Sequence, residues 1–292
     1  MTHSPQRRSL LAALGALAFS PMFAAARPKI AAADRRLADL EKTLDGRLGL
    51  FALDTGNHAQ LAYRADERFP FCSTFKVIAA AAALLKDQQT PGLMQQRIHY
   101  RQHDLVPYSP VTEKHVDDGM TVAALCAAAI QYSDNTAGNL LIELVGSPAA
   151  VTAFARTIGD TQFRLDRRET ALNSAIPGDP RDTTTPRAMA HSLHRLALGD
   201  ALAPAQRMQL QDWMRGNTTG ASRIRAGIPP DWQAADKTGT GDYGSANDIA
   251  LLWPPGRAPI VLAIYTTRHQ QDAGARSDVI AQATRIVVDW LT

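Results

Sequence analysis

Segments with the pattern of β-strands lie near the two ends of the chain, and the long stretch between them has a different pattern. Apolar residues bounded by turn signals predict strands at 48–53, 61–63, 233–240, 248–253 and 260–266. Thr55, Gly56 and Asn57 predict a turn between the first two strands. Both ends are therefore expected in one sheet layer, and the chain between them is expected to form an insertion.

The stretch between the strands is predicted to be mostly helical. Alanine and leucine dominate 74–86, and Thr121 can cap a helix over 122–131. Ser147-Pro148 and Thr185-Pro186 each open a further helix, because proline suits the first helical position. The other predicted helices lie at 37–44, ending near Gly46, at 203–215 and at 277–291.

The predicted fold class is α/β, an α+β sandwich. An antiparallel sheet of about five strands is flanked by helices, and a second, largely helical domain is inserted. We expect the sheet domain to be discontinuous, with residues 27–66 and 217–292, and the helical domain to cover 67–216. The cleft between two domains is a usual ligand site. Residues 166–184 show no clear period and are predicted to form a long surface loop, which is often functional.

Residues 1–26 have the pattern of an export signal. Arg7 and Arg8 precede an apolar run at 10–19, and small residues at 24–26 end the segment. The paired arginines favour the twin-arginine route, although a general export signal shares them. A permanent membrane anchor is the alternative, but the run is too short and interrupted to span well. We expect the signal to be removed and the mature protein to be soluble, periplasmic and monomeric, with no membrane partner.

Charge and histidine content point to no nucleic-acid partner, metal or cofactor. Removing Arg7 and Arg8 from the 31 basic residues leaves 29 against 28 acidic ones, and the basic residues are scattered. His191 and His194 could share a helix face, but no H-E-x-x-H pattern or cysteine cluster accompanies them. We therefore expect packing or solvated roles for these histidines.

Ser73 and Lys76 form the first candidate catalytic pair. They lie three residues apart at the start of a predicted helix, so they share one face. The lysine can assist deprotonation of the hydroxyl, and the N–H groups of the helix N-terminus can stabilise an oxyanion. Alone, however, this pattern favours a helix cap beside a solvated lysine.

Two further short motifs follow. Ser133-Asp134-Asn135 is predicted between helices, where a hydroxyl could relay a proton and an amide could hold a substrate carbonyl. Lys237-Thr238-Gly239, extended by Thr240, lies on a predicted edge strand. There the glycine would let a substrate approach the backbone, while the lysine and hydroxyls would hold an anion. Alone, the first motif is a turn or cap and the second is a polar strand end.

In this order, separated by about 60 and then about 100 residues, the three motifs are those of class A β-lactamases and penicillin-binding proteins. The chain resembles the class A serine β-lactamases over essentially its whole mature length, which implies the β-lactamase/D,D-peptidase-like fold. A fourth motif, Glu169 with Asn173 four residues on, lies in the predicted loop. Without the other motifs Glu169 would be interpreted as a solvated loop residue. Arg167 and Asp182 match an ion pair that holds this loop in the family.

The resemblance implies a role for each motif residue. Ser73 would be the nucleophile, and its N–H and that of Thr240 would form the oxyanion hole. Glu169 and Asn173 would hold the hydrolytic water, with Glu169 as its base. For the acylation step, Lys76 and Glu169 both remain candidate bases. The other implied roles are proton transfer to the leaving nitrogen by Ser133, binding of the substrate amide by Asn135, and binding of the substrate carboxylate by Lys237, Thr238 and Thr240.

The resemblance also assigns two residues around the cleft. Tyr108 corresponds to an aromatic gate, with a solvated surface tyrosine as the alternative. Many family members carry an arginine shortly after the Lys-Thr-Gly strand, but residues 243–247 of this chain contain none. Arg223 matches a substitute seen in other members and could supply the same charge; a structural surface arginine is the alternative.

Cys72 and Cys126 are the two cysteines, and an exported protein could join them. Each matches half of a family disulfide, but the partner positions hold Gly241 and Ala80. We therefore predict two buried free thiols. Cys72 as a nucleophile is the sharper alternative, but adjacent residues of a helix point about 100° apart, so only one of Cys72 and Ser73 can face the cleft.

The predicted activity is hydrolysis of penicillins and cephalosporins through an acyl-enzyme on Ser73. A small-molecule β-lactam is the expected substrate, and antibiotic resistance is the expected consequence. One alternative is a D,D-peptidase acting on cell-wall peptides, which would lack the base at Glu169. The other is a β-lactam sensor that stays acylated, which usually needs a membrane-spanning connection to a signalling partner.

Overall fold

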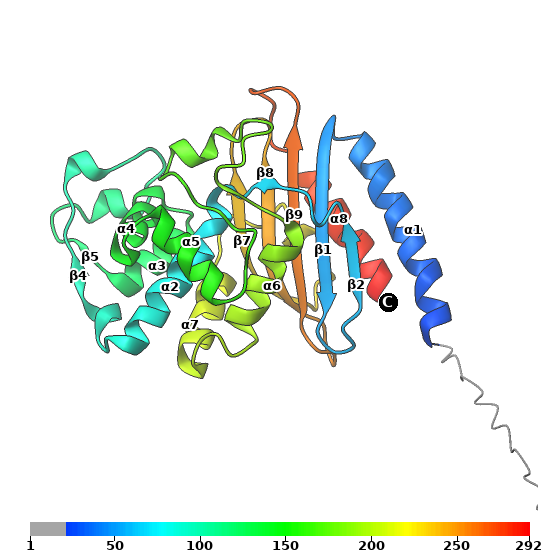
Figure 1. Ribbon diagram of the computed structural model, residues 1–292, viewed down its shortest axis with the longest axis horizontal. Coiled ribbons are helices and arrows are strands. Elements are labelled where there is room, and N and C mark those ends of the chain that lie inside the picture. Colours follow the sequence, from blue (N-terminus) through cyan, green and yellow to red (C-terminus); the bar gives the residue numbers. More distant parts are fainter. Residues whose placement is uncertain (1–21) are drawn as a thin grey trace, which may run out of the picture.

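The computed structural model describes residues 22–292 of the chain (Figure 1). The predicted export signal therefore lies almost entirely outside the described residues. No single helix within 22–292 combines the length and apolar composition of a membrane span. Helices α4 (Asn135–Val145) and α5 (Pro148–Thr157) pass that test only as a pair, and they are bent by 69° relative to each other.

The predicted five-stranded antiparallel sheet is confirmed. Its strands run in the order β2-β1-β9-β8-β7, so the N-terminal hairpin pairs directly with the C-terminal strands. Their bounds are Gly46–Asp54 for β1, Gln60–Tyr63 for β2, Gln233–Thr240 for β7, Ala246–Trp253 for β8 and Ile260–Arg268 for β9. Strand β7 forms one edge of the sheet, as predicted.

The predicted first helix is present and ends near Gly46, at Lys42. Helix α1 covers Met22–Lys42, and Gly46 is the first residue of β1, opposite Arg268 of β9. A Cβ at this position would lie 1.9 Å from the Thr267 carbonyl oxygen, so the residue is a glycine because two strands approach closely.

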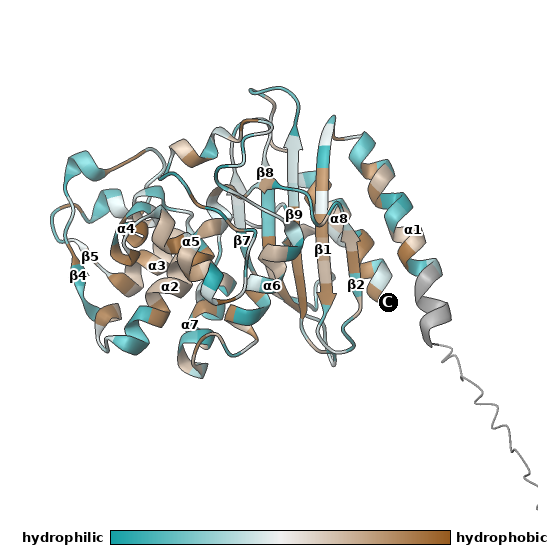
Figure 2. Ribbon diagram, viewed as in Figure 1, coloured by the Kyte–Doolittle hydropathy of each residue, from teal (hydrophilic) through white to brown (hydrophobic). Residues whose placement is uncertain are grey.

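Helices cover both faces of the sheet (Figure 1). Helices α1 and α8 (Ser277–Leu291) pack on one face, and α6 (Pro186–Ala197) covers the other and leads to the remaining helices. Figure 2 shows hydrophobic and hydrophilic residues alternating along α1, as expected for a helix with one face on the sheet. Two hydrophobic clusters result, one on each side of the sheet. The predicted domain boundaries stay a prediction.

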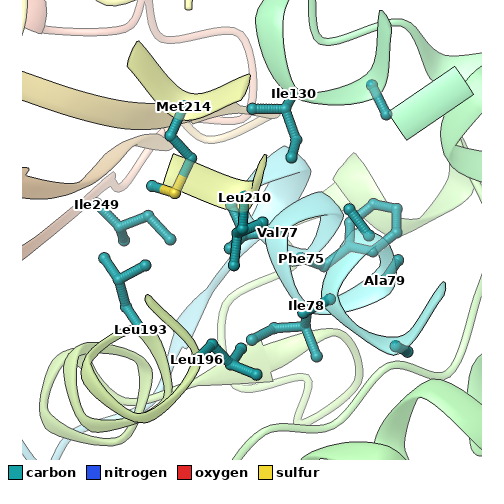
Figure 3. Close-up of a cluster of buried hydrophobic side chains, with 14 of the residues drawn as sticks. Phe75, Val77, Ile78, Ala79, Ile130, Leu193, Leu196, Leu210, Met214 and Ile249 are labelled. Atoms are coloured by element: carbon teal, nitrogen blue, oxygen red, sulfur yellow. The ribbon is translucent and has the colours of Figure 1, made fainter. Parts of the chain in front are cut away.

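Helix α2 (Phe75–Gln89) lies at the centre of the larger cluster, and all its residues from Phe75 to Leu84 are buried. In Figure 3 its Val77 and Ile78 lie among Ile130, Leu193, Leu210 and Ile249, which come from three other helices and from strand β8. These helices are α3 (Val122–Gln131), α6 and α7 (Pro204–Arg215). Burial of α2 on all sides fixes the position of the chain that immediately precedes it.

The predicted helix starts agree with the structure. The hydroxyls of Thr121, Ser147 and Thr185 accept hydrogen bonds from backbone N–H groups three residues on, at 3.1–3.2 Å. Two predictions need correction. Ser73 lies in a short 3₁₀ turn, Cys72–Thr74, before α2 begins, and Asn135 begins helix α4 where we had expected a loop.

Short elements connect these parts. The two-residue strands β3 (Phe69–Pro70) and β6 (Thr183–Thr184) pair with each other, as do β4 (Arg97–Ile98) and β5 (Met120–Thr121). The other 3₁₀ turns are Leu93–Gln95, Gln102–Asp104, Thr112–Lys114, Ala171–Ser174 and Ile224–Ala226. The pairing of β3 with β6 brings the exit of the 166–184 loop beside the chain that leads to Ser73.

Candidate active site

Ser73 lies where the sheet meets the helical region. The hydroxyl of Thr74 is 3.0 Å from the Tyr265 hydroxyl of β9. The side-chain amide of Asn247, on β8, donates to the carbonyl oxygens of Pro70 and Phe71, at 2.8 and 3.1 Å. These contacts fix the turn that carries Ser73 against the sheet. Lys76 follows one helical turn later, and its Nζ lies 2.9 Å from Ser73 Oγ.

Lys76 Nζ is enclosed by oxygen atoms. It is within hydrogen-bond distance of Ser73 Oγ, the Ser133 carbonyl oxygen at 2.8 Å, Asn135 Oδ1 at 2.7 Å and Glu169 Oε1 at 3.0 Å. Burial lowers the pKa of Lys76, and the charge of Glu169 opposes that shift. Two of the neighbours are carbonyl oxygens and one is a carboxylate, so all three can only accept hydrogen bonds. An ammonium group satisfies this set better than a neutral amine.

Gly138 makes room for Lys76. A Cβ at this position, on helix α4, would lie 2.8 Å from Lys76 Cε. The sequence gave no reason to select this glycine, because the helix that carries it was not predicted.

Glu169 is buried and shares the Ser73 hydroxyl with Lys76. Ser73 Oγ donates to Glu169 Oε1 at 3.0 Å, and Asn173 Nδ2 donates to Oε2 at 2.5 Å. The other atom of that amide, Asn173 Oδ1, is buried without a hydrogen-bond partner among the described residues. It is therefore free to accept a hydrogen bond from a small molecule beside the carboxylate.

Asn139 holds the backbone of Glu169 and was missed in the sequence. Its Nδ2 donates to the Glu169 carbonyl oxygen at 2.9 Å, and its Oδ1 accepts from the Glu169 N–H at 2.8 Å. It follows Asn135 by one helical turn, a spacing that becomes informative only once helix α4 is known.

The predicted ion pair of the loop is present. Arg167 Nε lies 2.6 Å from Asp182 Oδ2, and Asp182 Oδ1 accepts the backbone N–H groups of Asp166 and Arg167. Both ends of the loop are thus held by one buried carboxylate. Glu169 and Asn173 lie on the segment of chain between these two ends.

Lys237, on β7, faces Ser133 across the cavity. Its Nζ donates to Ser133 Oγ at 3.0 Å and to the Thr238 carbonyl oxygen at 2.7 Å. Complete burial lowers the pKa of Lys237 well below its usual range, and the nearby charge of Lys76 acts in the same direction. Ser133 therefore lies between two lysines, one at its hydroxyl and one at its carbonyl oxygen.

Arg223 is buried, so the alternative of a surface arginine was wrong. Its guanidinium donates to the carbonyl oxygens of Gly239 and Asn247 and to Thr240 Oγ1, each at 2.7 Å. Thr219, which the sequence analysis did not select, also belongs to this group, because its Oγ1 lies 2.5 Å from Thr238 Oγ1. The edge strand thus presents hydroxyls with a guanidinium behind them.

The packing of β7 against the turn at Ser73 requires a glycine at position 239, which the sequence did not predict. A Cβ there would lie 2.7 Å from the Phe71 carbonyl oxygen and 3.2 Å from the Ser73 backbone nitrogen. The glycine lets strand β7 approach the turn that carries Ser73. Its expected role of admitting a substrate to the backbone stays a prediction.

The predicted residues surround one cavity of about 420 Å³. Lys76, Glu169 and Lys237 are buried behind its wall, and Tyr108, 62% exposed, stands at its rim. The residues that line it are Ser73, Tyr108, Ser133, Asn135, Asn173, Thr219, Arg223, Thr238, Gly239 and Thr240. The structure therefore brings together every residue that the sequence singled out for the site.

The prediction of two buried free thiols is confirmed for Cys72 and Cys126. Burial raises the pKa of both thiols, and the charge of Glu169 raises that of Cys72 further. Cys72 is thus a poor nucleophile beside Ser73. His191 packs against Phe51, with ring centroids 5.2 Å apart. Within the described part of the chain, no group of three or more histidine, cysteine or acidic residues could hold a metal.

Comparison with known proteins identifies the family. The model of the β-lactamase enzyme family matches residues 32–291. The chain is 53% identical to β-lactamase OXY-1 of Klebsiella oxytoca, over the full length of both. The chain belongs to the class A β-lactamase family. The resemblance seen in the sequence is thereby confirmed, and the enzyme is a β-lactam hydrolase.

Other relatives agree. The enzyme is 54% identical to β-lactamase CTX-M-8 of Citrobacter amalonaticus, over 94% of this chain and 92% of that protein. It is 56% identical to the carbapenem-hydrolyzing β-lactamase KPC of Klebsiella oxytoca, over 87% of each. A crystal structure of a β-lactamase from Desulfarculus baarsii DSM 2075 is 60% identical, covers 90% of this chain and 98% of its own, and superposes with a TM-score of 0.89.

Proposed function

We propose that the enzyme hydrolyses penicillins and cephalosporins through an acyl-enzyme on Ser73, and that a water activated by Glu169 releases the product. One observation carries the proposal: the Ser73 hydroxyl is bonded to both Lys76 Nζ and Glu169 Oε1 at the wall of the cavity. A nucleophile within reach of a base and open to a ligand is the arrangement that acyl transfer requires.

Glu169 is the better candidate for the acylation base. The carbonyl and carboxylate acceptors around Lys76 Nζ favour its charged form, which cannot take a proton. Ser73 Oγ points its hydrogen at Glu169 Oε1, so the carboxylate can take that proton directly. The charge of Lys76 then stabilises the alkoxide as it attacks the β-lactam carbonyl.

The oxyanion hole consists of the N–H groups of Ser73 and Thr240. The close approach of Gly239 to the Ser73 nitrogen supports this pairing, because it brings β7 beside the nucleophile. As the carbon–nitrogen bond of the ring breaks, Ser133 passes a proton to the leaving nitrogen. Lys237 Nζ donates a hydrogen bond to Ser133 Oγ, which stabilises that oxygen as it gives up the proton.

Deacylation follows from the same network. The proton that Glu169 took from Ser73 leaves to the water of the cavity, and Ser133 regains from that water the proton it gave to the leaving nitrogen, so Glu169 is a carboxylate again. Once Ser73 Oγ is part of an ester it has no hydrogen to donate, so Glu169 Oε1 is free to accept one from the hydrolytic water. Asn173 holds Glu169 Oε2 through its Nδ2, and its unpartnered Oδ1 can accept the second hydrogen of that water. The carboxylate removes a proton, and the hydroxide attacks the ester.

The substrate is held at the other side of the cavity. The hydroxyls of Thr238 and Thr240, with the charges of Lys237 and Arg223, bind the carboxylate that penicillins and cephalosporins carry. Asn135 binds the side-chain amide, and Tyr108 closes the rim. The mature protein acts as a periplasmic monomer after removal of the export signal, and its activity confers resistance to β-lactam antibiotics.

The test is hydrolysis of a penicillin and a cephalosporin by Ser73→Ala, with Ser147→Ala as the control. Ser147 only caps helix α5, so that variant keeps its turnover. Ser73→Ala loses it and forms no covalent adduct in intact-protein mass spectrometry. In the unaltered enzyme the adduct is transient. An adduct that persists for hours would favour the peptidase or sensor instead, and full turnover by Ser73→Ala would refute the proposal.

A further inference from the structure

A second cavity, of about 390 Å³, shares no lining residue with the active-site cavity. Residues 175–181, the second half of the loop that carries Glu169 and Asn173, form one of its walls. The opposite wall consists of the chain around β3 and the end of β9, including Arg268. None of the proposed catalytic residues lines it, so its function is separate from the catalytic steps.

The cavity is strongly basic. Arg47, Arg68, Arg181, Arg268 and His269 line it, against two acidic residues, Glu67 and Asp179. The exposed side chain of Ile176, with Pro177 and Pro180, adds an apolar surface at the loop side. The lining therefore suits an anion that also carries a small apolar body.

The two acidic residues are already neutralised. Both oxygens of Asp179 accept from Arg181, at 2.7–3.1 Å. Glu67 accepts from Arg64 with Oε1 and from Arg47 with Oε2. Neither carboxylate is left to balance the other arginines of the cavity.

Arg68 and Arg268 have only neutral acceptors and form no ion pair within residues 22–292. Arg68 donates to the carbonyl oxygen and Oε1 of Gln162 and to Thr183 Oγ1. Arg268 donates to the carbonyl oxygens of Leu44 and Gly274, the latter at a long 3.4 Å. These bonds restrain the two side chains and leave their positive charges without a carboxylate partner among residues 22–292.

We propose that this cavity binds a small organic polyanion, with several carboxylate or phosphate groups, between Arg68 and Arg268. Guanidinium groups bind such anions through charge-assisted hydrogen bonds. The cavity is large enough for a compact ligand of this kind. Because 175–181 forms one wall, the bound anion restrains the second half of the catalytic loop.

Citrate is the probe, titrated by calorimetry into the mature protein at low ionic strength, with inorganic phosphate as a smaller anion. We expect saturable binding of one citrate, weakened at least tenfold by Arg68→Gln and by Arg268→Gln. Arg68→Lys and Arg268→Lys keep the charge and keep most of the affinity. Arg285→Gln is the control, since Arg285 is an exposed arginine on α8 that likewise donates to a backbone carbonyl oxygen.

A second measurement locates the site. Bound citrate should slow hydrogen exchange of the backbone N–H groups in 175–181, and the effect should be lost in Arg68→Gln. Citrate that binds in the active site would instead be lost in Arg223→Gln and kept in Arg68→Gln, and that result overturns the proposal. The proposal is also overturned if Arg68→Gln and Arg268→Gln leave citrate binding unchanged, or if no saturable binding is measured. Neither measurement uses β-lactam turnover, so the outcome does not depend on the proposed catalytic function.

Discussion

Ser73 has two neighbours that could take its proton, and the atoms around each neighbour decide between them. Lys76 is surrounded by groups that can only accept, so a proton on its nitrogen satisfies more hydrogen bonds than a lone pair would. Glu169 receives hydrogen bonds from Ser73 and from Asn173, which suits a carboxylate. These hydrogen-bond partners indicate that Lys76 is charged and that Glu169 accepts the proton of Ser73.

Glu169→Gln tests this assignment. An amide cannot take a proton from Ser73 or from water, so we expect kcat for a penicillin to fall by about 10³-fold, within the usual range for loss of a general base. Formation of the acyl-enzyme, followed over time by intact-protein mass spectrometry, should slow as well, because the same carboxylate takes the proton of Ser73. Glu143→Gln is the matched control, because Glu143 is an exposed carboxylate that pairs only with Arg168. Equal rates for the two variants would contradict the assignment.

Another buried carboxylate, Asp248 on β8, is expected to make the stability of the fold depend on pH. Its Oδ2 accepts from the Ile224 N–H at 3.1 Å, and its Oδ1 has no partner among the described residues. Burial raises the pKa of Asp248 well above its usual range, and Asp236 adds to the shift, while Arg223 and Lys237 oppose it. The folded chain therefore keeps this proton at pH values where the unfolded chain has lost it.

The direction of this pKa shift determines how the free energy of unfolding should change with pH. A raised folded pKa makes stability fall as pH rises above about 3.9, the ordinary value for aspartate, towards the folded pKa. Asp248→Asn has no proton to lose and can keep the bond to Ile224. Its stability relative to the unaltered enzyme should therefore increase with pH, as measured by urea unfolding from pH 4 upwards. A difference that is constant across this range would show that Asp248 does not titrate.

At the scale of elements, helix α4 organises one side of the active site. It carries Asn135 and, one turn later, Gly138 and Asn139, so one side of the helix contacts Lys76 and the Glu169 backbone. Asp134 caps the helix and accepts from the Ala137 N–H at 2.8 Å. The same carboxylate accepts from the N–H groups of Val111 and Thr112 and from the Thr112 hydroxyl, which connects the helix to a neighbouring loop.

Asp134→Ala should therefore cost more than loss of an ordinary cap. Removing one cap costs about 1 kcal/mol, and each buried donor left without a partner adds about 1–3 kcal/mol. We expect a loss of roughly 3–5 kcal/mol in the free energy of unfolding, comparable to breaking a buried charged group from its partners. Ser147→Ala, which removes only the cap of α5, should cost about 1 kcal/mol. Similar losses for both variants in urea unfolding would show that Asp134 acts only as a cap.

At the scale of the whole molecule, the active site is a junction between segments far apart in the chain. Cys72 precedes Ser73, Gly241 follows β7, and Asn173 lies in the loop that carries Glu169. A Cβ at Gly241 would lie 2.8 Å from Cys72 Sγ and 2.7 Å from the Asn173 carbonyl oxygen. All three segments therefore meet at this glycine.

Gly241→Cys should form a disulfide with Cys72, since the added Cβ lies within the reach of such a bond. Because the bond closes a long loop of the chain, we expect a stabilisation of about 2–4 kcal/mol, reduced by the contact with Asn173. Under oxidising conditions the unfolded variant should show one reactive thiol, from Cys126, and its Tm should fall on reduction. Gly241→Ser supplies the Cβ without the thiol. Three reactive thiols after oxidation would contradict the prediction.

The sequence alone determined the sheet, most of the helices and the set of residues proposed for the site, because local pattern carries that information. Alternating strands, capping hydroxyls and prolines at first helical positions are properties of neighbouring residues, and the motifs could be recognised by their order along the chain. Helix α4 escaped prediction because its first turns contain asparagine, threonine and glycine, which are weak helix formers. Packing against α2 stabilises it nevertheless.

Only the tertiary structure decided how these residues act on one another. That Asn139 holds Glu169, that Gly138 makes room for Lys76 and that Arg223 is bonded to two strands are facts of contact between distant segments. No pattern in one segment encodes them, because the sequence specifies a residue's own chemistry, whereas its charge state and partners depend on what the fold buries beside it.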